Sequence, residues 1–114
     1  MGLTKSLRLA QAAEFARVRS EGKSFPGRFM VVSVLKADEI EGWKCGFITP
    51  KKLGKAVERT RARRRLRELV RADSERLRKG RWIVLIARWR LPQASFAELK
   101  KDWQGAAGRA GLLD

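Results

Sequence analysis

Apolar residues recur in blocks along the chain, and these blocks predict alternating helices and strands. Helix-forming residues fill 8–20, and Gly22 marks the end of this first helix. Two apolar segments follow at 29–35 and 43–49, and each has the length and composition of a strand. Because a short acidic link separates these two segments, they are predicted to pair as an antiparallel hairpin.

The second half of the chain predicts a long basic helix, a buried strand and a final helix. The helical period runs over roughly 57–78, and Gly80 is the stop signal beyond it. The wholly apolar segment 82–87 predicts a central strand, and Ser95 is placed to cap the last helix. One face of that helix is apolar and carries Phe96, Leu99, Trp103, Ala106 and Ala110. The tail at about 105–114 is rich in small residues and is expected to fray.

The predicted order αββαβα is typical of one α+β domain with a mixed sheet, in two layers. A chain of 114 residues has room for one domain and one modest core, so residues 1–114 form a single predicted unit. Its 44% hydrophobic content is enough for that core and argues against disorder throughout the chain.

The predicted basic helix has two chemically different sides. On a wheel of 100° per residue, one stripe can dock on the sheet and holds Ala62, Leu66, Leu69, Asp73 and Leu77. The opposite side holds Thr60, Arg63, Arg64, Arg67 and Arg71, with Arg61 at its edge. Neighbouring arginines at i,i+4 repel each other by about 0.2–0.5 kcal/mol per pair. The row therefore indicates an anionic ligand, since arginine forms bidentate hydrogen bonds with phosphate and stacks on bases.

The net charge points to the same class of ligand. The chain has 27 Lys and Arg residues against 12 Asp and Glu residues, which leaves a formal charge of +15 and a pI near 11.4. A compact domain with so much like charge repels itself and gains most from a polyanionic partner. Nucleic acid is the first candidate, and an anionic membrane surface is the weaker one.

Several classes of function are disfavoured by what the sequence lacks. It contains no histidine, which removes the usual general base and the commonest zinc ligand, and no nucleophile–base pair stands out. We therefore predict neither a catalytic residue nor a metal site in the polypeptide. The single cysteine, Cys45, lies in an apolar run and fits a buried position in a reducing compartment. The sequence shows no signal peptide and no long apolar segment, so a cytoplasmic location is expected.

One continuous motif carries a family resemblance. Residues 46–68 have the sequence Gly-Phe-Ile-Thr-Pro-Lys-Lys-Leu-Gly-Lys-Ala-Val-Glu-Arg-Thr-Arg-Ala-Arg-Arg-Arg-Leu-Arg-Glu. This segment resembles the signature of the bacterial ribonuclease P protein family. In that signature a strand ending in Lys-Lys, then Gly-x-Ala-Val, leads into Arg-Asn-Arg-x-Lys-Arg-x-x-Arg-Glu. Weaker similarity extends over roughly 8–90, through Phe15 and Gly22 upstream and 83–88 downstream.

The resemblance implies a fold, an RNA partner, and separate roles for the RNA and the polypeptide. The family fold has a left-handed βαβ crossover, against the usual right-handed preference, and the helix at 57–78 would form it. The catalytic subunit is an RNA that removes the 5′ leader from precursor tRNA with Mg²⁺, which the RNA mainly holds. The polypeptide would assist by binding ribonuclease P RNA and the single-stranded leader of the precursor tRNA. Binding to DNA or to a membrane is not expected.

The resemblance also implies two sets of binding residues. The first set faces the catalytic RNA and comprises Lys51, Lys52, Lys55, Arg59, Thr60, Arg61, Arg63, Arg64, Arg67 and Arg71. The second set lines a cleft for the leader and comprises Phe15, Arg19, Val31, Ser33 and Thr49. A base can stack on an aromatic ring such as that of Phe15 for about 1–3 kcal/mol. Without the resemblance, ordinary core packing would be the simpler role for Phe15.

Three positions depart from the family pattern. Thr60 stands where the signature has Asn, so it offers a hydroxyl in place of an amide. Arg19 and Ser33 stand where many relatives have aromatic residues. Leader binding is therefore expected to depend less on stacking and more on phosphate contacts.

Three other functions fit part of the pattern. A ribosomal-protein-like or general RNA-binding module would share the size and charge but have no role in tRNA processing. A DNA-binding module is disfavoured because the basic helix has almost no Asn or Gln to recognise bases. A stand-alone nuclease is disfavoured because Glu68, Asp73 and Glu75 do not converge, and Glu68 more simply pairs with an arginine. The four tryptophans are scattered, and Trp89 is the best candidate among them for RNA contact.

Overall fold

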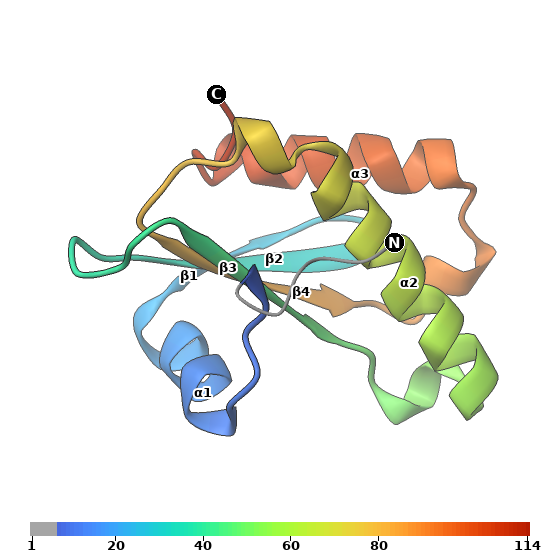
Figure 1. Ribbon diagram of the computed structural model, residues 1–114. Helices are drawn as coiled ribbons and strands as arrows, with labels where there is room; N and C mark the ends of the chain where they lie inside the picture. Colours follow the sequence, from blue (N-terminus) through green and yellow to red (C-terminus); the bar gives the residue numbers. More distant parts are fainter. Residues whose placement is uncertain (1–6) are drawn as a thin grey trace.

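The computed structural model describes residues 7–114, which form a four-stranded sheet with helices on both faces (Figure 1). Its main elements are α1 (Ala12–Glu21), β1 (Lys23–Pro26), β2 (Met30–Lys36), β3 (Trp43–Ile48), α2 (Ala56–Ala72), β4 (Arg81–Ala87) and α3 (Phe96–Arg109). Short 3₁₀ helices lie in the connections: η2 (Lys51–Leu53), η3 (Ser74–Arg76) and η4 (Leu91–Gln93). The predicted order αββαβα is confirmed, with β1 as an additional strand before β2. Residues 1–6 of the predicted domain lie outside the described part.

β4 lies inside the sheet, and its position separates β2 from β3. The strand order is β1-β2-β4-β3, with antiparallel pairing except between β3 and β4, which are parallel. The predicted hairpin of 29–35 and 43–49 is therefore wrong. The reason is burial: Ile83, Val84 and Leu85 are fully buried, and a strand that is apolar on both faces is most stable between two neighbours.

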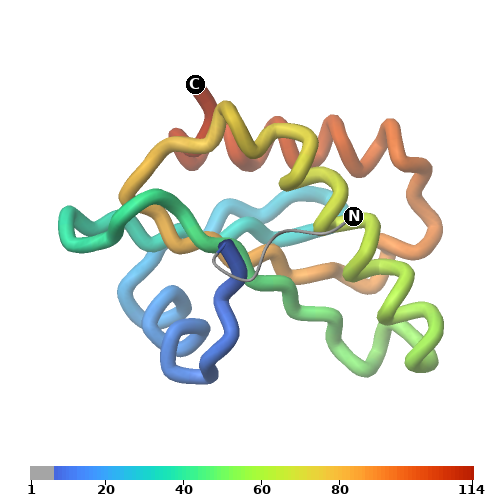
Figure 2. The backbone as a smooth tube through the Cα atoms, in the orientation of Figure 1, coloured from blue at the N-terminus to red at the C-terminus, as the bar shows by residue number. Residues whose placement is uncertain are grey.

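β3, α2 and β4 form the parallel βαβ unit that the family resemblance implies. Parallel neighbours need a long connection, and α2 supplies it on the face that it shares with α3 (Figure 2). The left-handed sense of this crossover stays a prediction.

Two cores lie on the two faces of the sheet. The larger core lies between the sheet and the α2–α3 layer and includes Val32, Leu66, Ile83, Leu85 and Trp103. The smaller core lies on the side of α1 and includes Leu9, Val18, Leu35, Ile40 and Val84. The two predicted layers are thus the sheet and the α2–α3 pair, while α1 covers part of the opposite face (Figure 1).

α2 ends at Ala72, well before the predicted position 78, and Asp73 becomes its C-cap. The Asp73 carboxylate turns to α3, where Oδ2 accepts hydrogen bonds from Trp103 Nε1 (2.8 Å) and Gln104 Nε2 (3.4 Å). Leu77 is buried as the wheel predicts, but from the segment after η3 rather than from a longer helix.

The start of the first helix and the strand after it also differ from the prediction. Arg8 forms a bridge with Cys45, and the Leu9 N–H donates to the Cys45 carbonyl (3.1 Å), so the helix begins at Ala12 rather than at 8. β1 was not predicted because it is short, largely exposed and ends in Pro26, features that weaken a strand signal.

The C-terminal segment packs on the domain instead of fraying. α3 continues to Arg109, Leu112 is fully buried, and Leu113 forms a bridge with Leu77. The expectation of fraying over 105–114 is therefore wrong, because Leu112 adds apolar surface to the larger core. No helix within residues 7–114 combines the length and the apolar character needed to cross a bilayer.

α3 begins at the capping residue that the sequence predicts. Ser95 Oγ accepts a hydrogen bond from the Glu98 N–H (3.1 Å), and the Glu98 carboxylate accepts one from the Ser95 N–H (2.9 Å). Leu99, Trp103 and Ala106 are fully buried, as the apolar face predicts. Phe96 and Ala110, at the two ends of that face, are more exposed.

Candidate RNA interface

The apolar stripe predicted from the helical wheel holds α2 on the sheet. Ala62, Leu66 and Leu69 are at most 2% exposed, and Val70 is fully buried beside them. This burial fixes the rotation of α2 about its axis, and with it the direction of each remaining side chain.

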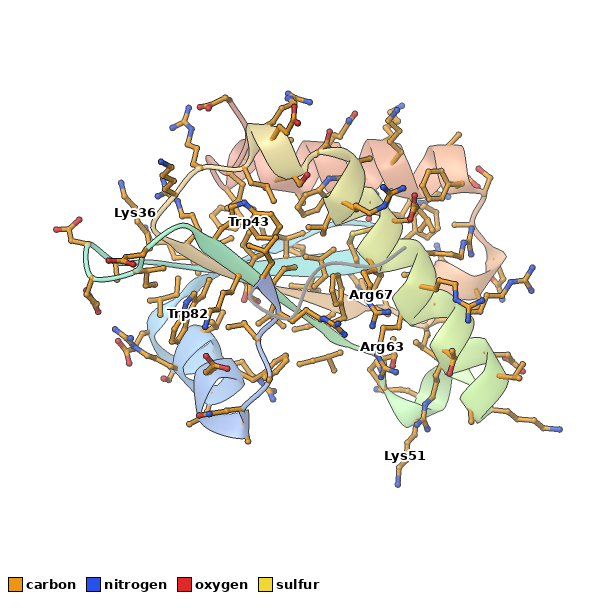
Figure 3. All side chains as sticks on the ribbon, in the orientation of Figure 1. Lys36, Trp43, Lys51, Arg63, Arg67 and Trp82 are labelled. Atoms are coloured by element: carbon orange, nitrogen blue, oxygen red, sulfur yellow. The ribbon has the colours of Figure 1, made fainter. Side chains whose placement is uncertain are left out.

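Four of the five arginines predicted opposite this stripe divide into two pairs. Arg63 and Arg67 are half-buried and point from α2 toward β3 (Figure 3). Arg61 and Arg64 are exposed, and neither makes an ion pair within residues 7–114. The row predicted from the wheel is therefore a β3-facing pair, a solvent-facing pair and Arg71, which is bonded to Glu68.

Specific contacts hold the β3-facing pair. Arg63 Nη2 donates a hydrogen bond to Thr49 Oγ1 (2.6 Å), directly after β3. The guanidinium carbon of Arg67 lies 5.8 Å from the centre of the Phe47 ring, within range of a cation–π interaction. Arg67 Nε is buried and has no acceptor among the described residues, so this donor can serve a ligand.

Arg63 and Arg67 line a cleft of about 570 Å³ beside β3, an edge strand of the sheet. The cleft, here named the arginine cleft, is lined by Arg8, Leu9, Ala10, Phe15, Cys45, Gly46, Phe47, Arg63 and Arg67. The Phe15 ring lies directly against Gly46, where an added Cβ would come within 2.5 Å of the ring. A side chain at position 46 would displace Phe15, so glycine is required for this approach. The cleft thus joins guanidinium groups to aromatic surface.

The arginine cleft concentrates positive charge, and no carboxylate is among its described lining residues. Burial, followed by the charges of Arg8, Arg63 and Arg64, holds the pKa of Arg67 below its ordinary value. Arginine nevertheless stays protonated in proteins. The lowered pKa therefore reflects desolvation and repulsion, which a bound anion would relieve.

Comparisons with known proteins identify the family of the chain. The family model for ribonuclease P matches residues 3–111 of the chain. The chain belongs to the ribonuclease P protein family. The ribonuclease P protein component of Symbiobacterium thermophilum is 42% identical over 111 residues, covering 97% of this chain and 96% of the relative. The corresponding protein of Gluconacetobacter diazotrophicus is 39% identical over 106 residues, covering 92% and 91%.

Solved structures of ribonuclease P proteins share the fold. The RNase P protein of Staphylococcus aureus superposes with a TM-score of 0.87 at 25% identity, covering 96% of this chain and 100% of that one. The RNase P protein of Thermotoga maritima superposes with a TM-score of 0.80 at 27% identity, covering 90% and 96%.

The lysines of the ribonuclease P signature lie at the start of α2 and are exposed. Lys51 and Lys52 belong to η2, and Lys55 is the N-cap of α2. Lys52 also lines a hollow of about 310 Å³ together with Trp89, whose side chain is 59% exposed. The structure therefore brings Trp89, the best candidate among the tryptophans for RNA contact, next to a predicted RNA-binding lysine.

The other signature residues differ in their exposure to solvent. Thr60 is exposed, and Arg59 is half-buried. Arg71 donates two hydrogen bonds to the Glu68 carboxylate, which confirms that Glu68 pairs with a neighbouring arginine. This contact holds the pKa of Glu68 below its ordinary value and raises that of Arg71. Arg71 thus offers less charge to RNA than Arg61 or Arg64.

Three of the five predicted leader-cleft residues lie on the α1 side of the sheet with accessible surface. Phe15 lines the arginine cleft, and Arg19 is exposed on α1. Val31 is half-buried and pairs with Ile86, which in turn pairs with Ile48. Val31, Ile86 and Ile48 thus form a half-buried apolar strip across the sheet.

Two of the predicted leader-cleft residues are placed differently. Ser33 is 2% exposed, and its hydroxyl is hydrogen-bonded to the Ser24 hydroxyl of β1 (2.9 Å). Thr49 is bonded to Arg63 on the α2 side of the sheet. The accessible surface available to a leader therefore excludes Ser33, and Thr49 acts on it through an arginine.

Sequence reasoning did not assign Arg8 and Phe47 to the site. Phe47 lies inside the signature, and Arg8 lies in the weaker upstream similarity. These positions relate both residues to the family but do not show that their side chains line a cleft. Their place in the arginine cleft depends on the pairing of Arg8 with Cys45 at the edge of β3, a long-range contact.

Replacing Thr49 with Val is expected to weaken RNA binding about tenfold, or about 1.4 kcal/mol, without unfolding the protein. Val keeps the shape of Thr but lacks the oxygen that accepts the hydrogen bond from Arg63. The guanidinium then loses its fixed orientation. Equilibrium binding of precursor tRNA to the protein assembled with ribonuclease P RNA measures the effect, and Thr49→Ser is the control that keeps the oxygen. Equal affinity of the Val and Ser variants would show that this bond does not orient Arg63 for RNA.

Proposed function

We propose that this chain is the protein subunit of ribonuclease P and assists a catalytic RNA in removing the 5′ leader from precursor tRNA. One observation carries the proposal: the fold places Arg63 and Arg67 in the same cleft as Phe15. Guanidinium groups beside an aromatic ring suit single-stranded RNA, whose phosphates and bases they bind separately. Membership in the ribonuclease P protein family supports the assignment.

The solvent-facing side of α2 is the proposed contact with the catalytic RNA. Arg61 and Arg64 are exposed there, and Lys51, Lys52 and Lys55 extend the charge at the start of the helix. Cations in a row along a helix neutralise successive phosphates and release their counterions. This side of the protein therefore binds RNA by backbone charge and requires no base sequence.

The arginine cleft and the apolar strip of Val31, Ile48 and Ile86 are the proposed path of the leader. Phe15 offers a ring for stacking. Arg63 and Arg67, which the family resemblance assigns to the catalytic RNA, line the same cleft and are proposed instead to donate to phosphates of the leader. The strip offers apolar surface for the faces of bases or sugars. Both features are sequence-tolerant, which fits an enzyme that processes precursors with different leaders.

Bond cleavage belongs in this proposal to the RNA, with Mg²⁺ held mainly by the RNA. No group of three or more His, Cys, Asp or Glu side chains in residues 7–114 is arranged to hold a metal ion. The proposal assigns the metal-dependent step to the RNA. The side chains of the polypeptide bind the two RNAs and hold the substrate in place, which reduces the entropic cost of bringing the leader to the reacting centre.

A binding competition distinguishes this function from that of a ribosomal-protein-like module. Labelled ribonuclease P RNA is bound by the protein at 0.15 M salt, and either unlabelled ribonuclease P RNA or ribosomal RNA is added. The proposal expects ribonuclease P RNA to compete at a much lower concentration. Better competition by ribosomal RNA would contradict it and favour the ribosomal function.

Replacing Arg19 with Ala is expected to weaken the binding of precursor tRNA to the assembled enzyme and to reduce its salt dependence. Arg19 is exposed on α1, about one helical turn after Phe15 of the proposed leader path. One lost phosphate contact lowers the slope of log K against log salt by about 0.7 for a single strand. Mature tRNA, which has no leader, is the control ligand and should bind both proteins equally. An unchanged affinity and slope for the precursor would remove Arg19 from the leader path.

A further inference from the structure

A second basic hollow lies on the α3 side of the sheet, far from the start of α2. It encloses about 560 Å³, and its lining includes Lys23, Phe25, Lys36, Arg78, Arg81 and Arg109. We name this hollow the far basic pocket. Lys36 lies at one end of the molecule, and Lys51 of η2 lies at the other (Figure 3). Neither the family signature nor the proposed leader path includes any residue of this pocket.

The strand register places three cations of this pocket next to one another. Lys36 of β2 and Arg81 of β4 are direct cross-strand partners, and Lys23 of β1 is the partner of Val34, two residues before Lys36. All three side chains line the same hollow and are named the strand cations. Like charges directly opposite each other destabilise a sheet, so this arrangement opposes the stability of the free protein.

Nearby carboxylates are engaged by other arginines. Glu21, which also lines the pocket, is paired with Arg17 (3.4 Å), and Asp114 is paired with Arg78 (3.1 Å). Within residues 7–114 the strand cations make no ion pair, and Arg81 Nη1 donates a hydrogen bond to the uncharged Lys79 carbonyl (2.5 Å). Their charge is therefore available to an anion from outside.

The remaining walls of the pocket are held in place by the fold. Arg109 Nη2 donates a hydrogen bond to the Pro26 carbonyl (2.9 Å), which fixes the last turn of α3 over β1. Phe25 is half-buried and packs on the larger core, so its exposed part forms a rigid apolar surface. A preformed hollow of this kind binds a ligand with little loss of side-chain entropy.

We propose that the far basic pocket binds the sugar–phosphate backbone of RNA, as a second contact separate from α2 and the arginine cleft. The strand cations and Arg109 bind phosphates, and Phe25 supports a sugar or base. The pocket lies at the first residue of β4, whereas the hollow of Lys52 and Trp89 lies at its last. A strand of this length spans about 20 Å, so one folded RNA or two RNAs can occupy both ends at once. The identity of the RNA in this inference rests on the proposed function. The binding of phosphates by the pocket does not depend on that function.

The test compares Lys36→Gln/Arg81→Gln with a control of equal charge loss, Lys100→Gln/Lys101→Gln, on exposed positions of α3. Affinity is measured over a series of salt concentrations in two arms. One arm uses ribonuclease P RNA with the protein alone, and the other uses precursor tRNA with the assembled enzyme. The pocket variant should bind at least about tenfold more weakly in one arm, with a salt slope reduced by about 1.4–1.8, as two lost phosphate contacts require. Urea unfolding should show it to be at least as stable as the parent, because a like-charge pair is removed.

The arm that shows the loss identifies the RNA: the catalytic RNA in the first, the precursor in the second. No loss in either arm overturns the proposal, and so does an equal loss in the control variant, which reports net charge alone. A destabilised pocket variant with unchanged salt slope would mean that the strand cations serve the fold and also overturns it. If the parent protein prefers ribosomal RNA, the proposed function fails, while the salt slopes still decide whether the pocket binds RNA backbone.

Discussion

Replacing Arg61 and Arg64 with Gln is expected to weaken binding of ribonuclease P RNA at least about 100-fold. Each charge-assisted hydrogen bond contributes about 1.5–3 kcal/mol, so two lost contacts account for that factor. Both side chains are exposed on α2 and make no ion pair within residues 7–114, so their removal breaks no contact that holds the fold together. Gln keeps a long side chain with high helix propensity, which preserves α2 itself.

The measurement is equilibrium binding over a range of salt, with urea unfolding in parallel. The slope of log K against log salt should fall by about 1.4–1.8, and the free energy of unfolding should change by less than about 0.5 kcal/mol. The Lys100→Gln/Lys101→Gln variant removes equal charge from α3 and should keep nearly the parent affinity. Equal weakening in both variants would mean that net charge, rather than the α2 surface, determines binding.

Replacing Trp103 with Ala is expected to cost about 3–5 kcal/mol of unfolding free energy, the largest effect on stability that we predict. The Trp103 side chain is fully buried between the sheet and the α2–α3 layer, so its removal leaves a large cavity. Its Nε1 also donates to the Asp73 carboxylate, which is 8% exposed and would lose its shortest hydrogen bond. The free energy of unfolding of a small domain is about 5–15 kcal/mol in total, so this variant is expected to be only marginally folded.

Two companion variants separate the causes. Trp103→Phe keeps most of the ring but removes the N–H, and it should cost about 1–3 kcal/mol for the weakened Asp73 contact. Trp89→Ala is the matched control, because Trp89 is 59% exposed and its loss should change stability by less than about 0.5 kcal/mol. Urea unfolding followed by far-UV circular dichroism measures all three. A cost below about 1 kcal/mol for Trp103→Ala would contradict the packing described for the α2–α3 layer.

Local signals in the sequence predicted the presence and order of the helices, the longer strands and the cap of α3, but not where α1 begins or α2 ends. Period, turn residues and the Ser95–Glu98 spacing are all set by neighbouring residues, so they are visible in the sequence. The order of the strands is not a local property. The order follows from the burial of both faces of β4. This burial places β4 between β2 and β3, although a short link joins β2 to β3 in the chain.

The candidate site was also predicted only as far as local signals define it. The wheel located the arginines on the free side of α2, because that side is defined by the buried leucines. It could not show that Arg63 turns to Thr49 while Arg61 faces solvent, because that division depends on where the edge of β3 lies. Ser33 was assigned to the leader cleft from the family resemblance. Its bond to Ser24 could not be predicted, because Ser24 lies in β1, a strand too short and exposed to give a clear signal.

The central claim is tested most directly by cleavage of precursor tRNA with a bacterial ribonuclease P RNA at low Mg²⁺, with and without this protein. The account predicts that the protein restores cleavage at the correct 5′ site and shows no cleavage by itself. Cleavage that stays unchanged, although the protein binds RNA with a steep salt dependence, would contradict it: the arginine surface would then serve another RNA.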